Sequence, residues 1–282
     1  MKVCILAVCY NSYEESLRYL DSIYSSIKNI NCTVVFFYID NSSIVDIEYV
    51  QSVKSYKDKF ELKYIKCQNL GYYPSISYAI NTLKIDLTDY DYSILSNVDL
   101  RVSKSFFETL EGFSKSKNIG ILAPSIYSRT LNLDKNPKIS IRPNYKKLTL
   151  NMFLYSNSFT FLILRIGNIL RLKVHNIIKR WVKQKPQNKN LDQIYAPHGS
   201  FKILTNEFNK KNIEINYPIF LFCEEIYLAE MCRKHGLKVI YRPDLLVYDS
   251  EGASTSLMKP KDYRDHNKRA LSYIIEKYNF HS

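Results

Sequence analysis

The chain has 282 residues, of which 46% are hydrophobic, and it carries 40 Lys and Arg against 27 Asp and Glu. This apolar content can form a core without a metal or disulfide staple, so we expect one large domain, with or without an appendage. The six cysteines form no C-x-x-C pair, which indicates free thiols in a reducing, cytoplasmic compartment. No charge-free run reaches the roughly 18 to 20 residues of a membrane span. A disulfide-stapled secreted domain and a membrane-spanning protein are therefore excluded.

The excess of positive charge is local. Residues 135–191 contain thirteen Lys or Arg and no Asp or Glu, whereas the rest of the chain has 27 of each sign. Such a segment predicts an anionic partner surface. Within it, residues 161–182 have the pattern of an amphipathic helix that Lys173 and Arg180 interrupt. Three interpretations stay open: a helix lying on a membrane, a helix covering the protein's own core, or a nucleic-acid contact, for which no recognised module is present. The apolar stripe consists of Ile163, Ile166, Leu170, Val174, Ile177 and Trp181.

The first half of the chain alternates strand and helix patterns. Residues 1–8 are too short for a signal-peptide core and predict a buried strand. Further strands are expected at residues 33–39, 62–65 and 92–95. Two helices are expected to begin at capping boxes, Ser12 with Glu15 and Ser105 with Glu108. This rhythm predicts an α/β fold with a mainly parallel sheet covered by helices on both faces.

The second half is less regular. We expect a strand at residues 119–122, a helix after residue 224 that ends at Gly236, a strand at 238–241 and a final helix at 260–278. The absence of repeats and low-complexity linkers favours a single domain over residues 1–282. Its expected parts are a nucleotide-binding half (1–125), the basic helical insert (135–191), an acceptor and catalytic half (192–258) and a C-terminal helix (259–282).

Polar clusters follow the first four predicted strands, after Val8, Ile39, Ile65 and Leu95. Because open parallel sheets bind ligands outside the carboxyl ends of their strands, we expect these clusters to meet at one crevice. Asn97 and Asp99 are two residues apart, so both oxygens can face one small volume, as a divalent cation beside a diphosphate requires. Alone, such a pair can equally satisfy loop backbone at a strand end.

Five motifs in order give the chain a specific resemblance. It resembles family 2 glycosyltransferases of the GT-A fold, in particular bacterial rhamnosyltransferase-like and polysaccharide-assembly members. The resemblance covers residues 3 to about 125 and about 196 to 280, outside the basic insert. The motifs are Cys9-Tyr10-Asn11, Ile39-Asp40-Asn41-Ser42, Asn69-Leu70-Gly71-Tyr72, Ser96-Asn97-Val98-Asp99 and Phe222-Cys223-Glu224-Glu225.

On the donor side, the resemblance implies that Asp40 accepts a hydrogen bond from the base of a nucleotide-sugar. Asn69 and Gly71 would form a further wall of that site. Asn97 and Asp99 correspond to a DxD-like motif, in which Asp99 would hold Mg²⁺ or Mn²⁺ against the diphosphate. The backbone near Ala7 to Tyr10 would line the base and ribose, and the candidate binding residues of this segment are Ala7, Cys9, Tyr10 and Asn11.

On the acceptor side, Glu224 and Glu225 align with the family's Glu-Asp pair, and Glu225 would be the general base of a single inverting displacement. Two glutamates in a first helical turn can also merely stabilise the helix dipole. His198 falls where relatives place the acceptor-side loop and would contact donor sugar or acceptor, unless it is a structural histidine beside a Gly turn.

The chain also departs from the family pattern. Asp249 stands where many relatives have a histidine, before the element Gly252-Ala-Ser-Thr255, and is either a second metal ligand or a solvated loop residue. Asn97 replaces the first acid of DxD. Arg264, with His266 and Lys268, is a candidate for the pyrophosphate, or part of a solvated basic helix face.

The sequence therefore predicts an inverting, metal-dependent hexosyl- or deoxyhexosyltransferase of bacterial surface polysaccharide synthesis, such as O-antigen or capsule. Its acceptor would be a glycan, lipid-linked at the cytoplasmic face of the membrane, and nucleic acid is not an expected partner. Two alternatives stay open: a catalytically inactive protein that binds a nucleotide-sugar or an anionic polymer, and a nucleotidyltransferase. The latter should have a Gly-rich, Lys-containing loop where this chain has residues 9–12.

Overall fold

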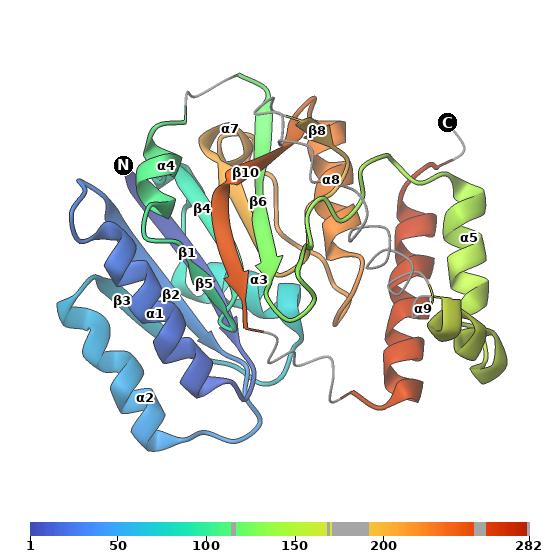
Figure 1. Cartoon of the computed structure of the whole chain (residues 1–282), viewed down its shortest axis with the longest axis horizontal. Coiled ribbons are helices and arrows are strands. Elements are labelled where there is room, and N and C mark those ends of the chain that lie inside the picture. The colour runs from blue at the N-terminus through green and yellow to red at the C-terminus, as the bar shows by residue number, and fades with distance from the viewer. Residues whose placement is uncertain (114–116, 168–169, 171–191, 251–257, 281–282) are drawn as a thin grey trace. The chain divides into compact units, whose positions relative to one another are not determined.

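The computed structural model describes residues 1–113, 117–167, 170, 192–250 and 258–280 (Figure 1). The chain forms two compact units, Met1–Arg142 with Asp192–Leu257 and Pro143–Leu191 with Met258–Ser282. Residues 135–142 of the predicted insert thus belong to the first unit. The stripe residues Val174, Ile177 and Trp181 and the element at 252–255 lie outside the described residues.

The first unit is built on a mixed sheet in the order β3-β2-β1-β4-β9-β6-β10-β5, with β7 beside β6 and β8 beside β10. Strands β1 to β4 run parallel to one another, and β6 runs parallel to β10. Strand β9 is antiparallel to both β4 and β6. This confirms the predicted mainly parallel α/β sheet. The strands are β1 (Lys2–Cys9), β2 (Thr33–Asp40), β3 (Glu61–Lys66), β4 (Tyr92–Asn97), β5 (Leu100–Val102), β6 (Ile119–Ser128), β7 (Leu133–Asp134), β8 (Asp192–Ile194), β9 (Phe201–Thr205) and β10 (Lys238–Asp249).

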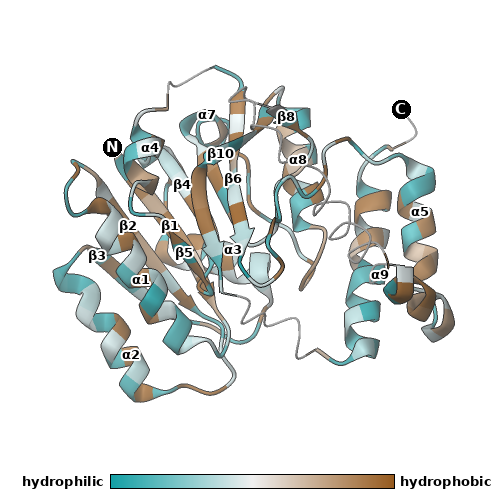
Figure 2. Cartoon of the chain, in the orientation of Figure 1, coloured by the Kyte–Doolittle hydropathy of each residue, from teal (hydrophilic) through white to brown (hydrophobic). Residues whose placement is uncertain are grey.

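Helices cover both faces of this sheet. In Figure 1, α1 and α2 lie in front of the first strands and α3 lies behind them. Central strands covered on both faces need near-continuous apolar sequence, and in Figure 2 β1 and β10 contain long brown stretches whereas α1 and α2 contain teal and white ones. The helices of this unit are α1 (Tyr13–Ile27), α2 (Ile47–Lys54), α3 (Tyr72–Leu83), α4 (Phe106–Glu111), α7 (Asn206–Asn209) and α8 (Glu224–Lys234), with short 3-10 turns η1 (Ser55–Asp58) and η2 (Leu87–Asp89).

The two predicted capping boxes do not form, although α1 and α4 begin where they were expected. Neither Ser12 nor Ser105 makes a side-chain cap. An N-cap serine normally has extended backbone, whereas Ser12 has φ −128° and ψ 49°, and Ser105 has φ −90° and ψ 4°. The Ser12 hydroxyl donates to the carbonyl of Tyr10 instead, at 3.0 Å. The predicted starts of α1 and α4 are confirmed, whereas the capping boxes predicted at these starts are wrong.

The second unit contains α5 (Tyr145–Leu154), helical residues 158–167 and α9 (Pro260–Lys277), the expected C-terminal helix. An aromatic cluster joins these helices, with ring centroids of Tyr155, Phe161 and Tyr263 separated by 5.9, 6.0 and 6.4 Å. The amide of Tyr145 also donates to the carbonyl of Phe280 at 3.1 Å. In the part of the chain that the structure describes, no helix is long and apolar enough to cross a bilayer.

Candidate active site

The sheet brings distant segments of the first unit to one edge. The carboxyl ends of β1, β2 and β4 are in register there, with Cys9 opposite Asp40 and Val8 opposite Asn97. Because β9 is antiparallel, its amino end reaches the same edge, with Phe201 opposite Ser96 of β4. The candidate site is therefore built from strand ends and the turns that follow or precede them.

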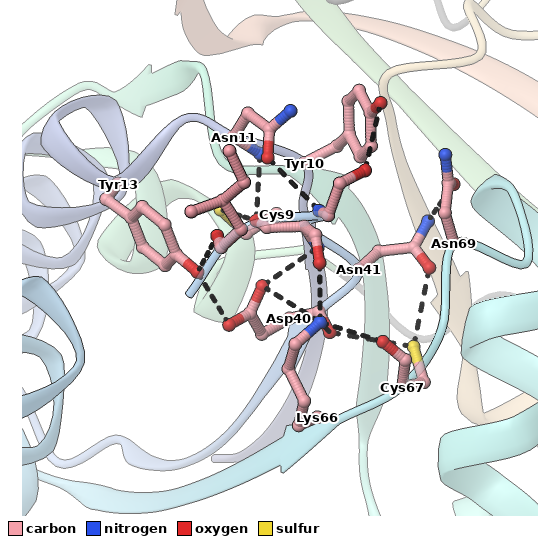
Figure 3. A network of polar contacts seen from close by, with 12 residues as sticks. Cys9, Tyr10, Asn11, Tyr13, Asp40, Asn41, Lys66, Cys67 and Asn69 are labelled. Atoms are coloured by element: carbon pink, nitrogen blue, oxygen red, sulfur yellow. Dashed lines mark hydrogen bonds and ion pairs between the residues drawn. The ribbon is translucent and has the colours of Figure 1, made fainter. Parts of the chain in front are cut away.

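Asp40 lies fully buried at the end of β2 (Figure 3). Its Oδ2 accepts hydrogen bonds from the hydroxyls of Tyr13 at 2.9 Å and Tyr64 at 2.6 Å. Its Oδ1 accepts the amide of Ser42 at 3.0 Å and lies 3.9 Å from Nζ of Lys66. Burial and the neighbouring carboxylate raise the pKa of Tyr64, so its hydroxyl stays a donor. A nucleotide base can reach Asp40 only by displacing one of these groups, and the predicted base contact stays a prediction.

The loops after β1 and β2 bond directly to each other. Asn11, at φ 52°, donates its amide to Oγ of Ser42 at 2.8 Å and accepts the amide of Ser43 at 3.2 Å. Ala7 and Cys9 are fully buried, whereas Tyr10 is half-buried and Asn11 is exposed. Tyr10 and Asn11 therefore have accessible side chains, and the predicted lining of the base and ribose by this segment stays a prediction.

Asn41 organises the neighbouring wall, a role that the sequence interpretation missed. Its Nδ2 donates to Oδ1 of Asn69 and to the carbonyl of Gly71, both at 3.1 Å, and its Oδ1 accepts the amide of Leu70 at 2.9 Å. Figure 3 shows Asn41 between Asp40 and Asn69. A buried Asn directly after Asp40 was the signal that could have revealed it.

Gly71 has φ 92°, and a Cβ at this position would lie 2.1 Å from the carbonyl oxygen of Phe220. That carbonyl accepts the amide of Tyr72 at 3.1 Å. The glycine is therefore required by close approach of the chain at residue 220, and α3 begins directly after it.

Asp99 and Asp249 lie at neighbouring strand ends. Asp249 is the last residue of β10 and is paired with Leu100 of β5, and the amide of Ser250 donates to the carbonyl of Asp99 at 3.1 Å. Burial, and next the charge of Asp249, raise the pKa of Asp99 to about 6. Asp249 is not a solvated loop residue, because its side chain is 10% exposed and pairs with Nζ of Lys135 at 2.7 Å.

This arrangement fits a hard divalent cation held jointly with a ligand. The carboxylates of Asp99 and Asp249 repel each other, the ammonium of Lys135 offsets part of this repulsion, and a divalent cation would offset more of it. Among the described residues, no group of three or more His, Cys, Asp or Glu is placed to hold a metal. Mg²⁺ commonly binds through one or two carboxylates together with phosphate oxygens, and Asp99 and Asp249 supply that number.

A turn at residues 198–200 meets the end of β4. The carbonyl of Ser200 accepts the amide of Asn97 at 2.9 Å. Nδ1 of His198 accepts the amide of Ser200 at 3.3 Å and lies 2.9 Å from its Oγ. Burial, and next the nearby lysines beginning with Lys138, hold the pKa of His198 well below its usual range. His198 is therefore a neutral imidazole whose remaining nitrogen, Nε2, carries the proton.

Glu224 and Glu225 open α8 as predicted. Glu224 is 8% exposed, and a Cβ added at Gly199 would lie 2.8 Å from its Oε1. Burial, and next the charge of Glu225, raise the pKa of Glu224 to about 7. Its Oε2 has no hydrogen-bond partner within the described chain. Glu225 is half-buried, so its carboxylate is the more accessible of the two.

Lys202 is a charged residue of this site that the sequence interpretation did not single out. It is fully buried on β9, and its Nζ donates to the carbonyl of Gly199 at 2.6 Å. The ammonium also lies 5.1 and 4.8 Å from the ring centroids of Tyr72 and Tyr73. A lysine within the apolar run Phe201–Thr205 was the available signal.

Arg264 lies on α9 in the second unit. Its Nη1 donates to Oγ of Ser158 at 2.6 Å, and its Nε is 3.8 Å from Oδ1 of Asp265. His266 is half-buried and Lys268 is exposed on the same helix. Their predicted role at a pyrophosphate stays a prediction.

Comparison of the whole chain with solved structures identifies the fold. TarS of S. aureus (residues 1–349) in complex with UDP-GlcNAc matches with a TM-score of 0.57 and 16% identity over 98% of this chain. TarS with UDP matches at 0.54 and 14% over 98%, and GalNAc-T7 with UDP, GalNAc and Mn²⁺ matches at 0.55 and 13% over 98%. The chain has the GT-A fold. At these identities the likeness establishes the fold alone.

The matched structures are longer than this chain, which spans 66%, 65% and 47% of their respective lengths. No protein-family model matches the chain, and no curated protein matches it in sequence. Within this GT-A fold, the edge of the first unit combines an oxygen-donor pair, a neutral histidine and a carboxylate pair beside a buried lysine. In general, carboxylates of this kind can bind a hard cation or accept a proton.

Proposed function

We propose that the protein is an inverting glycosyltransferase that moves a sugar from a nucleoside-diphosphate donor to a hydroxyl of a glycan acceptor. One observation carries the proposal: the 198–200 turn bonds to the end of β4 at Asn97 and contacts the carboxylate of Glu224 at Gly199. This contact supports the proposal, because Asn97 is two residues before Asp99 and Glu224 is next to Glu225, in a fold shared with a UDP-GlcNAc complex.

On the donor side, Asp99 and Asp249 would hold Mg²⁺ or Mn²⁺. When bound, the metal would neutralise charge that develops on the departing nucleoside diphosphate. Asn11 and Tyr10 would contact the nucleoside from the loop after β1, and Asn69 would close the neighbouring wall. Asp40 would accept a hydrogen bond from the base once a tyrosine hydroxyl is displaced.

On the acceptor side, Glu225 would accept the proton of the attacking hydroxyl. That oxygen forms its bond to the anomeric carbon while the bond from this carbon to the diphosphate oxygen breaks, so the configuration inverts. General-base assistance of this kind contributes about 10² to 10⁴ in rate. Glu224, the more buried of the two carboxylates, would not contact the acceptor directly. The neutral His198 would donate through Nε2 to the donor sugar or the acceptor.

A membrane surface is the proposed site of action. The second unit exposes large apolar side chains that are 49% to 72% accessible, in a segment without acidic residues. Apolar side chains next to Lys and Arg favour the surface of an anionic bilayer, and each well-placed cation adds about 1 kcal/mol. The six cysteines are free thiols, which supports a cytoplasmic location. The exposed apolar residues are Leu150, Phe153, Phe159, Leu162, Ile163, Ile166 and Leu170.

The membrane proposal is tested by sedimentation with vesicles. Wild type should bind vesicles containing anionic lipid at low salt, and replacement of Phe159 and Leu162 by Ser should weaken this binding. A matched control replaces Ile44 and Ile47, which are exposed in the first unit, by Ser. Equal binding by wild type and both double variants would contradict the proposal.

The donor proposal is tested by thermal unfolding with a panel of UDP-, TDP- and GDP-sugars, with and without Mn²⁺ or Mg²⁺. One donor class should raise the unfolding temperature in a metal-dependent way, and Asp99→Ala should abolish that rise. No stabilisation by any donor would contradict the proposal. Stabilisation without turnover on any acceptor would favour the inactive binding protein.

A further inference from the structure

We propose that Lys202 is the buried counter-charge of the Glu224–Glu225 pair and the positioning residue that holds Gly199 against Glu224. The inference rests on the glycosyl transfer proposed above, in which Glu225 is the base. It adds a residue on β9 that controls the charge of the acceptor side without touching substrate.

The environment of Lys202 requires a compensating charge. The side chain is fully buried and lies opposite Leu95 of β4, and its ammonium has the carbonyl of Gly199 as hydrogen-bond acceptor at 2.6 Å. The faces of Tyr72 and Tyr73 attract a cation but carry no net charge. An ammonium buried among such groups is costly unless an anion is near. Glu224 and Glu225 are the carboxylates whose charges act on it.

The pair of carboxylates, Glu224 and Glu225, needs a nearby positive charge. Glu224 is buried beside Glu225, and two such carboxylates do not both ionise without a cation. Positive charge reaches Glu224 from Lys202 on β9 first and from Lys138 second. Other titratable groups near this cluster are Cys223 before α8 and Tyr72 and Tyr73 of α3, which burial keeps protonated, and the neutral His198. Lys202 is therefore the principal group that allows Glu224 and Glu225 to be anions together.

The hydrogen bond from Lys202 to Gly199 also fixes the position of the turn at residues 198–200. The Gly199 carbonyl is fixed by the ammonium while its Cα faces Oε1 of Glu224. The same turn continues to Ser200, which bonds to Asn97 at the end of β4. Moving Lys202 would displace this turn from both carboxylate centres.

The titration of Lys202 and Glu224 should make the stability of the protein depend on pH. Burial lowers the pKa of Lys202 to about 8 and raises that of Glu224 to about 7, so both groups are charged between these values. The raised pKa of Glu224 contributes stability at low pH that is lost as pH rises through about 7. The lowered pKa of Lys202 contributes stability above its unfolded pKa that is lost as pH falls through about 8. The pair's contribution to stability is therefore smallest between the two values.

A double-mutant cycle with Lys202→Met and Glu224→Gln tests the coupling by denaturant unfolding at neutral pH. Lys202→Met alone should strand Glu224 without its cation, and the loss of stability should be clearly smaller in the Glu224→Gln background. Equal losses in both backgrounds would overturn the inference. This cycle needs no donor, so it can succeed even if the proposed transfer fails.

If Lys202→Met does not fold, the pH dependence of the stability of Glu224→Gln tests the inference by itself. Removing the anion should lower the pKa of Lys202 further, so the rise in stability on the alkaline side should begin at lower pH than in wild type. An unchanged alkaline limb would overturn the inference.

For folded Lys202→Met, the acid limb of the pH profile of kcat/KM should move to higher pH by about one unit, because the carboxylate pair that contains the base Glu225 loses its cation and retains a proton to higher pH. A lysine that only supported the turn would lower kcat without moving this limb. Lys2→Met is the matched control, since Lys2 lies 4.8 Å from the ring centroid of Tyr90 at the start of β1, and it should leave the limb in place.

Discussion

The amide of Asn97 donates to the carbonyl of Ser200 at 2.9 Å, and this bond joins the end of β4 to the turn that leads into β9. Asn97 and Ser200 lie 103 positions apart in the sequence. Because β9 runs antiparallel to β4, the chain returns to the same sheet edge with Gly199 against Glu224. The turn at residues 198–200 therefore lies against both the end of β4, two residues before Asp99, and the start of α8, which carries Glu224 and Glu225.

Gly71→Ala should destabilise the protein severely. Gly71 has φ 92° and ψ −170°, a backbone region essentially restricted to glycine, and the added Cβ would collide with the Phe220 carbonyl at 2.1 Å. We expect a loss of at least about 3 kcal/mol in the free energy of unfolding. Gly236→Ala is the matched control, because Gly236 has φ 69° with open space around it, and it should cost about 1 to 2 kcal/mol. If urea unfolding gave similar losses in the free energy of unfolding for Gly71→Ala and Gly236→Ala, the predicted collision would be refuted.

Tyr64→Phe should remove one of two phenol donors to the buried Asp40 carboxylate. A hydrogen bond to a charged, buried acceptor is worth about 1.5 to 3 kcal/mol, which is the expected loss in unfolding free energy. Tyr56→Phe is the control, because its hydroxyl donates to the largely exposed Asp21 at 2.5 Å and should cost less. If Asp40 recognises a base, Tyr64→Phe should also tighten binding of the nucleoside. Equal losses for the two variants would contradict the role assigned to Asp40 burial.

Asp249→Asn should weaken binding of Mn²⁺ in the presence of the nucleoside diphosphate by about tenfold or more, because it removes one of two carboxylates. Asp244→Asn is the control on the same strand, since Asp244 pairs with Arg242 away from Asp99. Calorimetric titration of the metal measures both variants. Unchanged affinity in Asp249→Asn would remove Asp249 from the metal site.

The strands β1 to β4 and the starts of α1 and α4 were predictable because local patterns determine them, whereas α2, β5 and β9 were not among the expected elements. Apolar runs such as Val3–Val8 and Thr33–Ile39 can only be strands covered on both faces, and the polar residues after them mark the ligand edge. The direction of β9 was not predictable, because no local pattern at residues 201–205 distinguishes an antiparallel strand from a parallel one. Without that direction, the contact between the 198–200 turn and Asn97 could not be anticipated.

Side-chain pairings were the less predictable part of the site. Ser12 and Glu15 matched a capping box in sequence, but the backbone entering α1 from β1 directs the Ser12 hydroxyl to Tyr10 instead. Lys135 was counted only as part of a basic segment, yet it pairs with Asp249 from 114 positions away. In the sequence Lys202 is one lysine among many, and only the fold shows that it is buried and bonded to Gly199, the residue that faces Glu224. Each of these pairings depends on tertiary contacts that no local sequence pattern encodes.

The most direct test of the account is metal-dependent release of nucleoside diphosphate from the donor that stabilises the protein, with a glycan acceptor present. Wild type should release it only with Mg²⁺ or Mn²⁺. Asp99→Ala should lose metal-dependent release, and Glu225→Gln should lower kcat by about 10² to 10⁴ with little change in the KM of the donor. Full activity in both variants would contradict the assignment of Asp99 and Glu225 to the chemistry.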